Sequence, residues 1–579
     1  MFPRSDISRR LFLALGASSF VAACSKTTGD GQPTASSEMS SSQAPSPQST
    51  SPGDVEPPTS TSSAPPIPYS QPGWLAIENA QAGTDNWRIN LDIAPTERLN
   101  MNGFIEGYAD TTSAQSGQVV NVYVNTGSPQ WHLEAYRMGY YGGLNARLIW
   151  TSETFEQAWQ FVEPSFDRET RMHAAQWSPS TSITIDDSWP PGSYLLKLNS
   201  SEGGAHYIPL TVRRDDCAAS LVVVSAVTTW QAYNPWGGRS LYENFGPGSR
   251  FDRSTVVSFD RPYASAYHWG SADFLTHELP LISLIEELGI DTAYVTDIDL
   301  HTSALDGDGT LNPVLTNRTA LLTTGHDEYY STPMRASLER ARDAGINLAF
   351  FGANAVYRHI RLEPNSESMP YRQLVNYRTA DSDPMTAQDP LQSTVQWRNA
   401  PLNQPESALI GVQYFAAGIT ASMKLVNTDN WVFKDVDLSN GRTMKKLVAI
   451  EADGLGPSSS EPSNLEVLAS SPVMYKDSRY NHAMTYYSTD SGAGVFATGT
   501  IGWINALDIA EWGDEKVSTF VREVTTNVLQ AFASGPTGTT HPSVERQSLS
   551  SVGATHRRLI ILKKQRVGAE GLEPPTSSV

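Results

Sequence analysis

Residues 320–330 read ALLTTGHDEYY and pass directly from a short apolar run into a cluster of ionisable and aromatic side chains. Three other apolar runs end in polar clusters in the same way: 221–225 before 229–234, 291–295 before 296–301, and 347–351 before 352–358. Short apolar runs that precede helical segments predict buried parallel strands. Because ligands of open α/β sheets bind outside the carboxyl ends of such strands, we expect the four clusters to meet in one site.

The segment 214–535 alternates strands of this kind with helical patterns, which is typical of a parallel α/β domain. Apolar residues at helical spacing predict helices over residues 279–288 and 514–532. Ser331 has the place of a capping hydroxyl at the start of another helix. Residues 361–440 are irregular and rich in Trp, Asn, Pro and Asp, and we expect this insertion to cover the site.

Residues 73–213 have a different pattern, with short alternating runs separated by Gly, Pro, Asn and Asp. Strands at this spacing, without a long helix between them, predict an antiparallel β-sandwich. Three tyrosines of this region, Tyr136, Tyr140 and Tyr141, allow two interpretations. They form either a surface on which carbohydrate stacks or ordinary packing in the core and between domains.

The amino-terminal residues predict export. Ser8-Arg9-Arg10 resembles a twin-arginine signal, and the apolar stretch that follows is too short to span a bilayer. Val21-Ala22-Ala23-Cys24 looks like a lipobox, so we expect residues 1–23 to be a signal peptide. Cys24 would then carry a lipid and hold the protein at the outer face of the cytoplasmic membrane. An amino-terminal anchor without lipid is the alternative.

Two segments lack the composition of a folded core. Residues 24–72 are dominated by Ser, Thr, Pro and Gly and cannot bury enough apolar surface, so they predict a disordered linker. Residues 536–579 show little core-forming pattern and predict a disordered tail.

The composition excludes some functions. A chain of 579 residues is too long for one core, and its net charge of −20 argues against nucleic acid as a partner. Of the two cysteines, Cys217 precedes its predicted strand, at the wrong edge of the sheet for a nucleophile. The predicted folded region also lacks a GxSxG elbow, so a covalent Cys or Ser mechanism is disfavoured.

Four motifs together suggest a family. They are YRMGYYGG at 136–143, WQAYNPWGG at 230–238, GHDEY at 325–329 and GANAVY at 352–357. In this order they resemble the large (β) subunit family of N,N-dimethylformamidase, over roughly residues 100–530. The resemblance implies a β-sandwich followed by a parallel α/β domain similar to class I glutamine amidotransferases, with a flavodoxin-like sheet.

The same resemblance implies an amide hydrolase with one mononuclear iron, held by two tyrosines and one glutamate. The two tyrosines map most plausibly to Tyr329 and Tyr357. The glutamate has no clear counterpart in residues 381–398, where we expect Asp389 to replace it. A phenolate is a hard anionic ligand, and an iron with open positions would activate water and polarise an amide carbonyl. The alternative is that both tyrosines pack or hydrogen-bond without a metal.

Other side chains of the clusters suit amide hydrolysis. His326 or Glu328 is a candidate general base, although a carboxylate at a helix start also has a structural explanation. Asn354 is a candidate donor to a developing oxyanion, and Asn is equally typical of a tight turn. His301, Asp297 and Asp299 form a second polar group, with either a metal or base role or a bracing role.

The sequence thus predicts an exported, lipid-anchored hydrolase that acts on a small amide or an envelope-derived substrate with metal assistance. A non-catalytic cell-envelope protein that binds glycan or peptide is the alternative. The oligomeric state and the need for a small partner subunit stay open.

Overall fold

The computed structural model describes residues 68–89, 104–160, 162–244, 249, 252–302, 311–439, 441–457 and 459–544. The predicted signal peptide, Cys24 and most of the predicted linker lie outside these residues. The chain divides into two compact units, and all described residues belong to the one that spans Ser62–Thr576. In these described ranges, no helix combines the length and the apolar character needed to cross a membrane.

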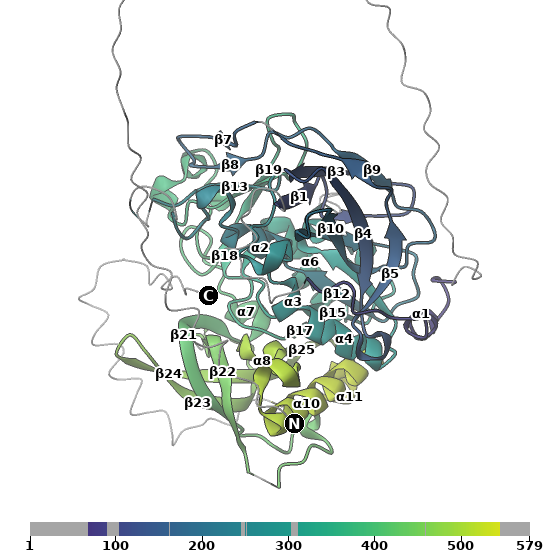
Figure 1. Ribbon diagram of the computed structural model, residues 1–579. Helices are drawn as coiled ribbons and strands as arrows, with labels where there is room; N and C mark the ends of the chain where they lie inside the picture. The colour runs from purple at the N-terminus through teal and green to yellow at the C-terminus, as the bar shows by residue number, and fades with distance from the viewer. Residues whose placement is uncertain are drawn as a thin grey trace, which may run out of the picture. The chain divides into compact units, whose positions relative to one another are not determined.

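Two β-sheets form the first folded region (Figure 1). One has the strand order β1-β3-β9, and the other has the order β2-β11-β10-β4-β5 with β6 paired to β4. Their bounds are β1 Ile105–Ala109, β2 Ser113–Ala114, β3 Val119–Thr126, β4 Gln130–Met138, β5 Ala146–Thr151, β6 Phe155–Glu156, β9 Thr181–Thr184, β10 Gly192–Ser200 and β11 Ala205–Val212. Alternate side chains of both sheets share one apolar core, as expected for a sandwich.

The residues before the sandwich pack elsewhere. Helix α1 (Trp74–Asn79) lies against the α/β region, where the Trp74 indole donates to the carbonyl of Ala218 at 2.7 Å and the Leu75 amide donates to Asp291 at 3.1 Å. Tyr69, in the predicted linker, is only 5% exposed. The linker prediction is therefore wrong for its last residues, because a few apolar side chains suffice to dock a segment of polar composition.

The central sheet has nine strands, and five of them are parallel in the order β14-β12-β15-β17-β25. Their bounds are β12 Leu221–Ser225, β14 Thr292–Thr296, β15 Ala320–Thr323, β17 Asn347–Phe350 and β25 Gly494–Ala497. Numbered along the chain, this order is 2-1-3-4-5, which is one of the two common doubly wound arrangements. The apolar runs of the sequence therefore form the buried parallel strands that were predicted.

Helices connect these strands, and their starts follow the capping signals. Their bounds are α2 Val227–Tyr233, α3 Phe274–His277, α4 Leu279–Glu287, α5 Asp297–Thr302, α6 Thr332–Asp343 and α10 Glu515–Ala533. The Ser331 side chain accepts from the Met334 amide at 3.3 Å, and the Asp514 side chain caps α10. The helices predicted over 279–288 and 514–532 are confirmed to within about one residue at each end.

Four long antiparallel strands extend the sheet: β21 Gln413–Lys424, β22 Thr443–Gly454, β23 Glu466–Tyr475 and β24 Ser478–Ser488 (Figure 1). The prediction that residues 361–440 are irregular is wrong for β21. This strand has three register shifts against β22, which interrupt the alternation of buried and exposed side chains. Sequence periodicity is weak where bulges interrupt a strand.

The predicted tail is also partly folded. Helix α11 (Thr537–Thr540) follows α10, and the Thr537 amide donates to Asn347 Oδ1 at 2.9 Å. Thr537 is buried, so the core continues beyond residue 535.

Buried charges join the sandwich to the α/β region. Arg137 of β4 pairs with Glu286 of α4 at 2.7 Å, and both side chains are fully buried. The Tyr141 hydroxyl donates to Glu78 at 2.6 Å within the same network. Tyr136 and Tyr141 are buried, so for these two residues the packing interpretation holds.

Candidate functional site

The polar clusters after the parallel strands meet at one edge of the sheet, as expected. Thr229 of α2 accepts hydrogen bonds from the amides of Glu328 at 3.0 Å and Tyr329 at 3.3 Å. The Thr228 amide donates to Asp297 at 2.9 Å, and the Tyr357 amide donates to the Glu328 carbonyl at 2.9 Å. These bonds connect all four clusters.

A short parallel pairing brings two of the clusters together. Strands β16 (Tyr329–Tyr330) and β18 (Arg358–His359) pair so that Tyr329 lies opposite Arg358. The loop before β18 contains two residues with left-handed backbone, Asn354 at φ 61° and Val356 at φ 52°. A β-branched residue rarely adopts this conformation, and such strain collects at functional sites.

Glu328 is the central anion of the site. Its carboxylate accepts from the hydroxyls of Tyr233 at 2.8 Å and Tyr242 at 2.6 Å and from Arg358 Nε at 3.3 Å. Burial alone would raise its pKa, but the nearby His326 and Arg358 side chains hold the pKa below its ordinary value. A general base works best with a pKa near the working pH, so Glu328 suits a fixed negative charge better.

His326 lies between three carboxylates. Its Nε2 is 3.6 Å from Glu328 Oε2 and 3.7 Å from Glu451 Oε2, and its Nδ1 is 3.8 Å from Asp273 Oδ2. Burial would lower its pKa, but the three carboxylates raise it well above the ordinary value. The three carboxylates therefore favour the protonated imidazolium form of His326, which can donate a proton.

Glu451 of β22 is a site residue that the sequence interpretation missed. Its side chain is almost buried, and its Oε2 has no hydrogen-bond partner among the residues that the structure describes. Burial raises its pKa, and the nearby charge of Glu328 raises it further against the opposing charge of His326. A lone carboxylate inside the apolar run at 447–452 was the available signal, because Glu is rarely buried in a strand without a partner.

The tyrosines line the same cluster. The Tyr329 hydroxyl donates to the Tyr242 hydroxyl at 2.8 Å. The Tyr357 ring centre lies 5.0 Å from that of Tyr414, and the Arg358 guanidinium carbon lies 4.9 Å from the Tyr357 centroid. Burial raises the pKa of Tyr357 to about 12 and that of Tyr329 further. Tyr233, Tyr242 and Tyr414 were not predicted as site residues.

Asn354 closes the cluster on the side of β22. Its backbone amide donates to Asp453 Oδ1 at 2.8 Å. Its side-chain Oδ1 and Nδ2 are both buried, and neither has a hydrogen-bond partner within the described part of the chain. The positive φ agrees with a turn role, while the unused amide agrees with a role in binding.

The structure does not bring Asp389 to this cluster. Asp389 is exposed, and its Oδ1 accepts from the Leu391 amide at 3.0 Å at the start of a short 3₁₀ turn. A carboxylate that caps an exposed turn is solvated and unsuited to complete a buried metal site. Glu451, whose Oε2 lies 3.7 Å from His326 Nε2, is a carboxylate that the structure does bring to this cluster.

The second predicted polar group has a bracing role. His301 Nδ1 lies 2.7 Å from Ser331 Oγ, and Asp299 accepts from the Thr296 amide at 2.7 Å. Asp299 also accepts from Ser113 of β2 at 2.7 Å, which ties the sandwich to the sheet. Cys217 is buried and its pKa is raised to about 11 by burial, so it is not an activated thiolate.

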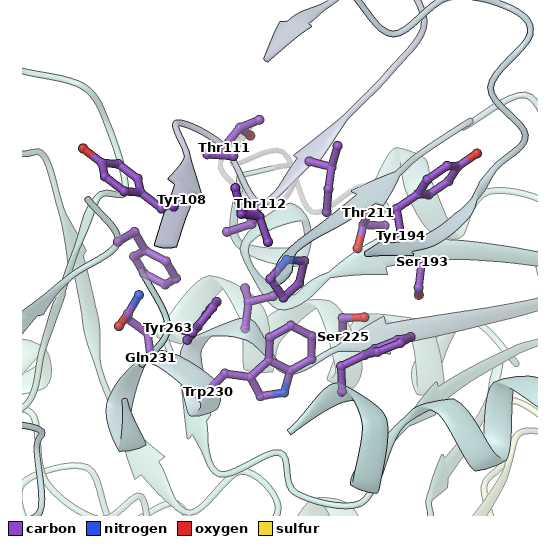
Figure 2. Close-up of a pocket in the computed structure, with 18 of the residues that line it drawn as sticks. Tyr108, Thr111, Thr112, Ser193, Tyr194, Thr211, Ser225, Trp230, Gln231 and Tyr263 are labelled. Atoms are coloured by element: carbon purple, nitrogen blue, oxygen red, sulfur yellow. The ribbon is translucent and has the colours of Figure 1, made fainter. Parts of the chain in front are cut away.

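One cavity lies away from this cluster, beside α2. This cavity lies between the sandwich and α2, has a volume of about 40 Å³ and is bordered by Tyr108, Thr211, Ser225 and Trp230 (Figure 2). Trp230 and Gln231 face this cavity, while Thr229 and Tyr233 of the same helix contact the Glu328 segment. The cavity has room for a few water molecules and is separated from the site by α2.

The donor set fits a hard metal ion only if tyrosine takes part. Over the described ranges, no group of three or more His, Cys, Asp or Glu side chains is placed to hold a metal. The phenols of Tyr329 and Tyr357 and the carboxylate of Glu451 offer hard oxygen ligands instead. The observation that fits a bound cation is that Glu451 Oε2 has no hydrogen-bond partner among the described residues.

Comparison with known families agrees with the motifs. A family model described as N,N-dimethylformamidase beta subunit-like, C-terminal, matches residues 132–517, which is more than half of the chain. No curated protein matches the chain significantly. The matched residues include β4, the parallel strands, the loops that bear His326 and Tyr357, and Glu451. The chain therefore belongs to the N,N-dimethylformamidase beta subunit-like family.

Proposed function

We propose that this protein is an exported, lipid-anchored hydrolase that cleaves the C–N bond of a small amide with the help of one iron ion. The observation that carries the proposal is the buried Glu451 carboxylate, whose Oε2 lies 3.7 Å from His326 and has no hydrogen-bond partner among the described residues. Family membership supports the reaction class but does not identify the substrate. The domain with the 2-1-3-4-5 sheet is, on this proposal, similar to class I glutamine amidotransferases.

Tyr329, Tyr357 and Glu451 would hold the iron. When bound, the iron would supply Lewis acidity for the amide carbonyl and lower the pKa of a water molecule. The raised pKa of both phenols means that metal binding must displace their protons, so loading becomes more favourable as pH rises.

The remaining residues have distinct tasks in amide hydrolysis. Glu328 keeps its negative charge, balances Arg358 and holds the hydroxyls of Tyr233 and Tyr242 in place. The Asn354 side-chain amide donates to the oxygen of the carbonyl as negative charge develops there. Water adds to the carbonyl carbon, and the His326 imidazolium gives its proton to the departing nitrogen as the C–N bond breaks. The proton that the water loses then returns to the His326 imidazole.

Metal analysis of the purified protein tests the proposal. We expect about one iron per chain and a visible tyrosinate absorption, both lost in Tyr329→Phe and in Tyr357→Phe. Tyr194→Phe is a matched control, because Tyr194 is equally buried and donates to the Pro190 carbonyl in the sandwich. Retained iron in both site variants would contradict the assignment. Metal-free protein that binds cell-wall polymer would favour the non-catalytic alternative.

The anchor is tested separately. We expect the protein in the membrane fraction with a diacylglyceryl group on Cys24, and we expect Cys24→Ala to release it. Mass spectrometry of the mature amino terminus detects the lipid, and an unmodified Cys24 would contradict this part of the proposal.

A further inference from the structure

A second cavity lies between the sandwich and α5, and we call it the outer cavity. Its volume is about 290 Å³, which is close to the smallest volumes typical of small-molecule sites. Its walls come from residues 110–118, from α5 and from residues 369–372. His326, Glu328 and Glu451 do not line it, so the outer cavity is separate from the proposed active site.

The charged side chains of the outer cavity already have partners within the protein. Arg213 pairs with Asp299, and Arg372 pairs with a carboxylate outside the cavity at 2.8 Å. The Asp110 carboxylate accepts from the Asn121 amide at 3.0 Å. Hydroxyl and amide groups, which both donate and accept hydrogen bonds, make up much of the remaining wall. This wall therefore suits a neutral ligand with several hydroxyls better than an ion. The residues that supply these groups include Thr111, Thr112, Ser113, Gln115, Gln118 and Tyr371.

The Tyr371 ring is held by its neighbours. Its centre lies 5.0 Å from that of the His301 ring in a T-shaped arrangement, and His301 Nδ1 lies 2.7 Å from Ser331 Oγ. The backbone of Tyr371 has a left-handed φ of 60°, which a bulky residue rarely adopts. The side chain is half-buried. An aromatic ring among hydroxyls and amides offers the C–H face of a sugar ring a surface on which to pack.

The outer cavity adjoins the smaller cavity beside α2, which we call the inner cavity. Thr111, Thr112 and Arg372 line both of them, and the two threonines are labelled at the inner cavity in Figure 2. At about 40 Å³ the inner cavity has room for about three water molecules. The carbonyl and methyl groups of an acetyl substituent occupy a similar volume.

The inner cavity combines apolar walls with a buried hydroxyl. Trp230, Phe259 and Phe274 supply apolar surface. Ser193, which also lines this cavity, is 4% exposed, and its Oγ has no hydrogen-bond partner in the described part of the chain. Because buried hydroxyls are almost always paired, this one points to a ligand group that enters the cavity. A methyl group matches the apolar wall, and a carbonyl oxygen beside it matches the hydroxyl.

We propose that the two cavities together bind an N-acetylated sugar. The sugar ring lies in the outer cavity against Tyr371, where its hydroxyls meet hydroxyl and amide groups. The acetyl group lies in the inner cavity, where the Ser193 hydroxyl donates to its carbonyl oxygen. This inference goes beyond the proposed amide hydrolysis and does not depend on it.

Calorimetry of the full-length protein with N-acetylglucosamine and with glucose tests the inference. We expect N-acetylglucosamine to bind about tenfold more tightly, because its acetyl group adds a buried methyl and a hydrogen bond. Equal binding of the two sugars, or binding of neither, overturns the inference. The disaccharide of N-acetylglucosamine identifies the source of the ligand. Tighter binding of the disaccharide than of the single sugar indicates a glycan chain, and equal or weaker binding indicates the free sugar.

Two variants locate the ligand. Ser193→Ala should weaken binding of N-acetylglucosamine by about fivefold and leave binding of glucose unchanged. Tyr371→Gly should weaken binding of both sugars by about tenfold or more, and glycine adopts φ 60° without strain. Wild-type affinity in both variants overturns the inference.

Matched controls exist for both variants. Ser518 is also buried without a hydrogen-bond partner among the described residues, but it lies on α10 and lines neither cavity. Tyr480 of β24 is half-buried and also lines neither cavity. We expect Ser518→Ala and Tyr480→Ala to bind both sugars as the wild type does.

Iron content and sugar binding are measured on the same preparation, which separates this inference from the proposed function. Iron-containing protein that binds no sugar overturns this inference alone. Iron-free protein that binds N-acetylglucosamine through Ser193 and Tyr371 supports this inference and overturns the proposed function. Iron-containing protein that binds the sugar supports both.

Discussion

Two glutamates lie at nearly equal distances from His326, yet their surroundings make them opposites. Glu328 comes from the loop after a parallel strand, and its carboxylate is surrounded by two hydroxyls and Arg358. Glu451 comes from the antiparallel strand β22, and its Oε2 has no hydrogen-bond partner among the described residues. Their pKa values are shifted in opposite directions. The Glu328 carboxylate is therefore fully used in hydrogen bonds and an ion pair within the protein. The Glu451 carboxylate has one oxygen that is free to accept a hydrogen bond.

Neutralising each glutamate in turn gives the largest expected contrast. Glu328→Gln should lower the free energy of unfolding by about 3 kcal/mol, because the buried Arg358 loses the carboxylate with which it pairs. Glu451→Gln should change the free energy of unfolding by about 1 kcal/mol or less, because Glu451 Oε2 has no hydrogen-bond partner among the described residues. Urea unfolding of metal-free protein at pH 7 measures both. Equal losses of unfolding free energy in the two variants would contradict the different roles given to Glu328 and Glu451.

Removing one hydroxyl beside Glu328 and one from the antiparallel strands tests the same difference between paired and unpaired groups. Thr229→Val should cost about 2 kcal/mol, because the amides of Glu328 and Tyr329 lose their acceptor inside the protein. Tyr414→Phe removes a buried hydroxyl that has no hydrogen-bond partner among the described residues. It should change the free energy of unfolding by about 0.5 kcal/mol or less. The same unfolding assay tests both variants, and a large loss in Tyr414→Phe would show that this hydroxyl has a structural role.

Glu278 allows the contrast to be tested by pH. It belongs to the strand-end side, where its Oε1 accepts from the Ala226 amide at 3.0 Å, and burial raises its pKa to about 8. A carboxyl whose pKa is raised by folding makes the protein less stable as pH rises from the unfolded value toward the folded one. Glu278→Gln lacks this loss, so its stability relative to wild type should increase steadily between pH 5 and pH 8.

Denaturant unfolding at several pH values checks this expectation. The other buried carboxyls titrate in both proteins, so their contributions cancel in the difference. A difference that does not vary with pH would mean that Glu278 titrates at its ordinary pKa.

The smallest expected effect concerns Asp389. Asp389→Ala should leave the iron content unchanged, because this carboxylate is solvated and only caps a turn. Its cost in stability should be about 1 kcal/mol or less. Glu451→Ala is the matched variant, and we expect it to lose the iron. Metal analysis after identical purification compares them, and iron loss in Asp389→Ala would return the third ligand to the insertion.

The strand-end half of the site could be predicted from the sequence because its signals are local. Each apolar run of four or five residues marks a strand, and the polar residues after it fall at the same edge when strands are parallel. His326, Glu328, Tyr329, Asn354 and Tyr357 were found in this way and by family motifs. The capping hydroxyl of Ser331 and the helix after it are equally local signals.

The antiparallel half could not be predicted, and Asp389 was chosen in place of Glu451. Which face of β22 points to His326 depends on the register of its pairing with β21, and a shift of one residue would turn Glu451 away. The bulges of β21 obscure that register in the sequence. Tyr242 and Tyr414 also reach the cluster only through contacts between segments far apart in the chain.

The sequence by itself determined the order of the strands along the chain, the family and the loops that supply half of the site, because these depend on short-range patterns. The tertiary structure alone decided which carboxylates lie beside His326 and which buried polar atoms have no hydrogen-bond partner among the described residues. Those properties depend on strand register and on the balance of burial against neighbouring charge, and both are set by residues distant in sequence.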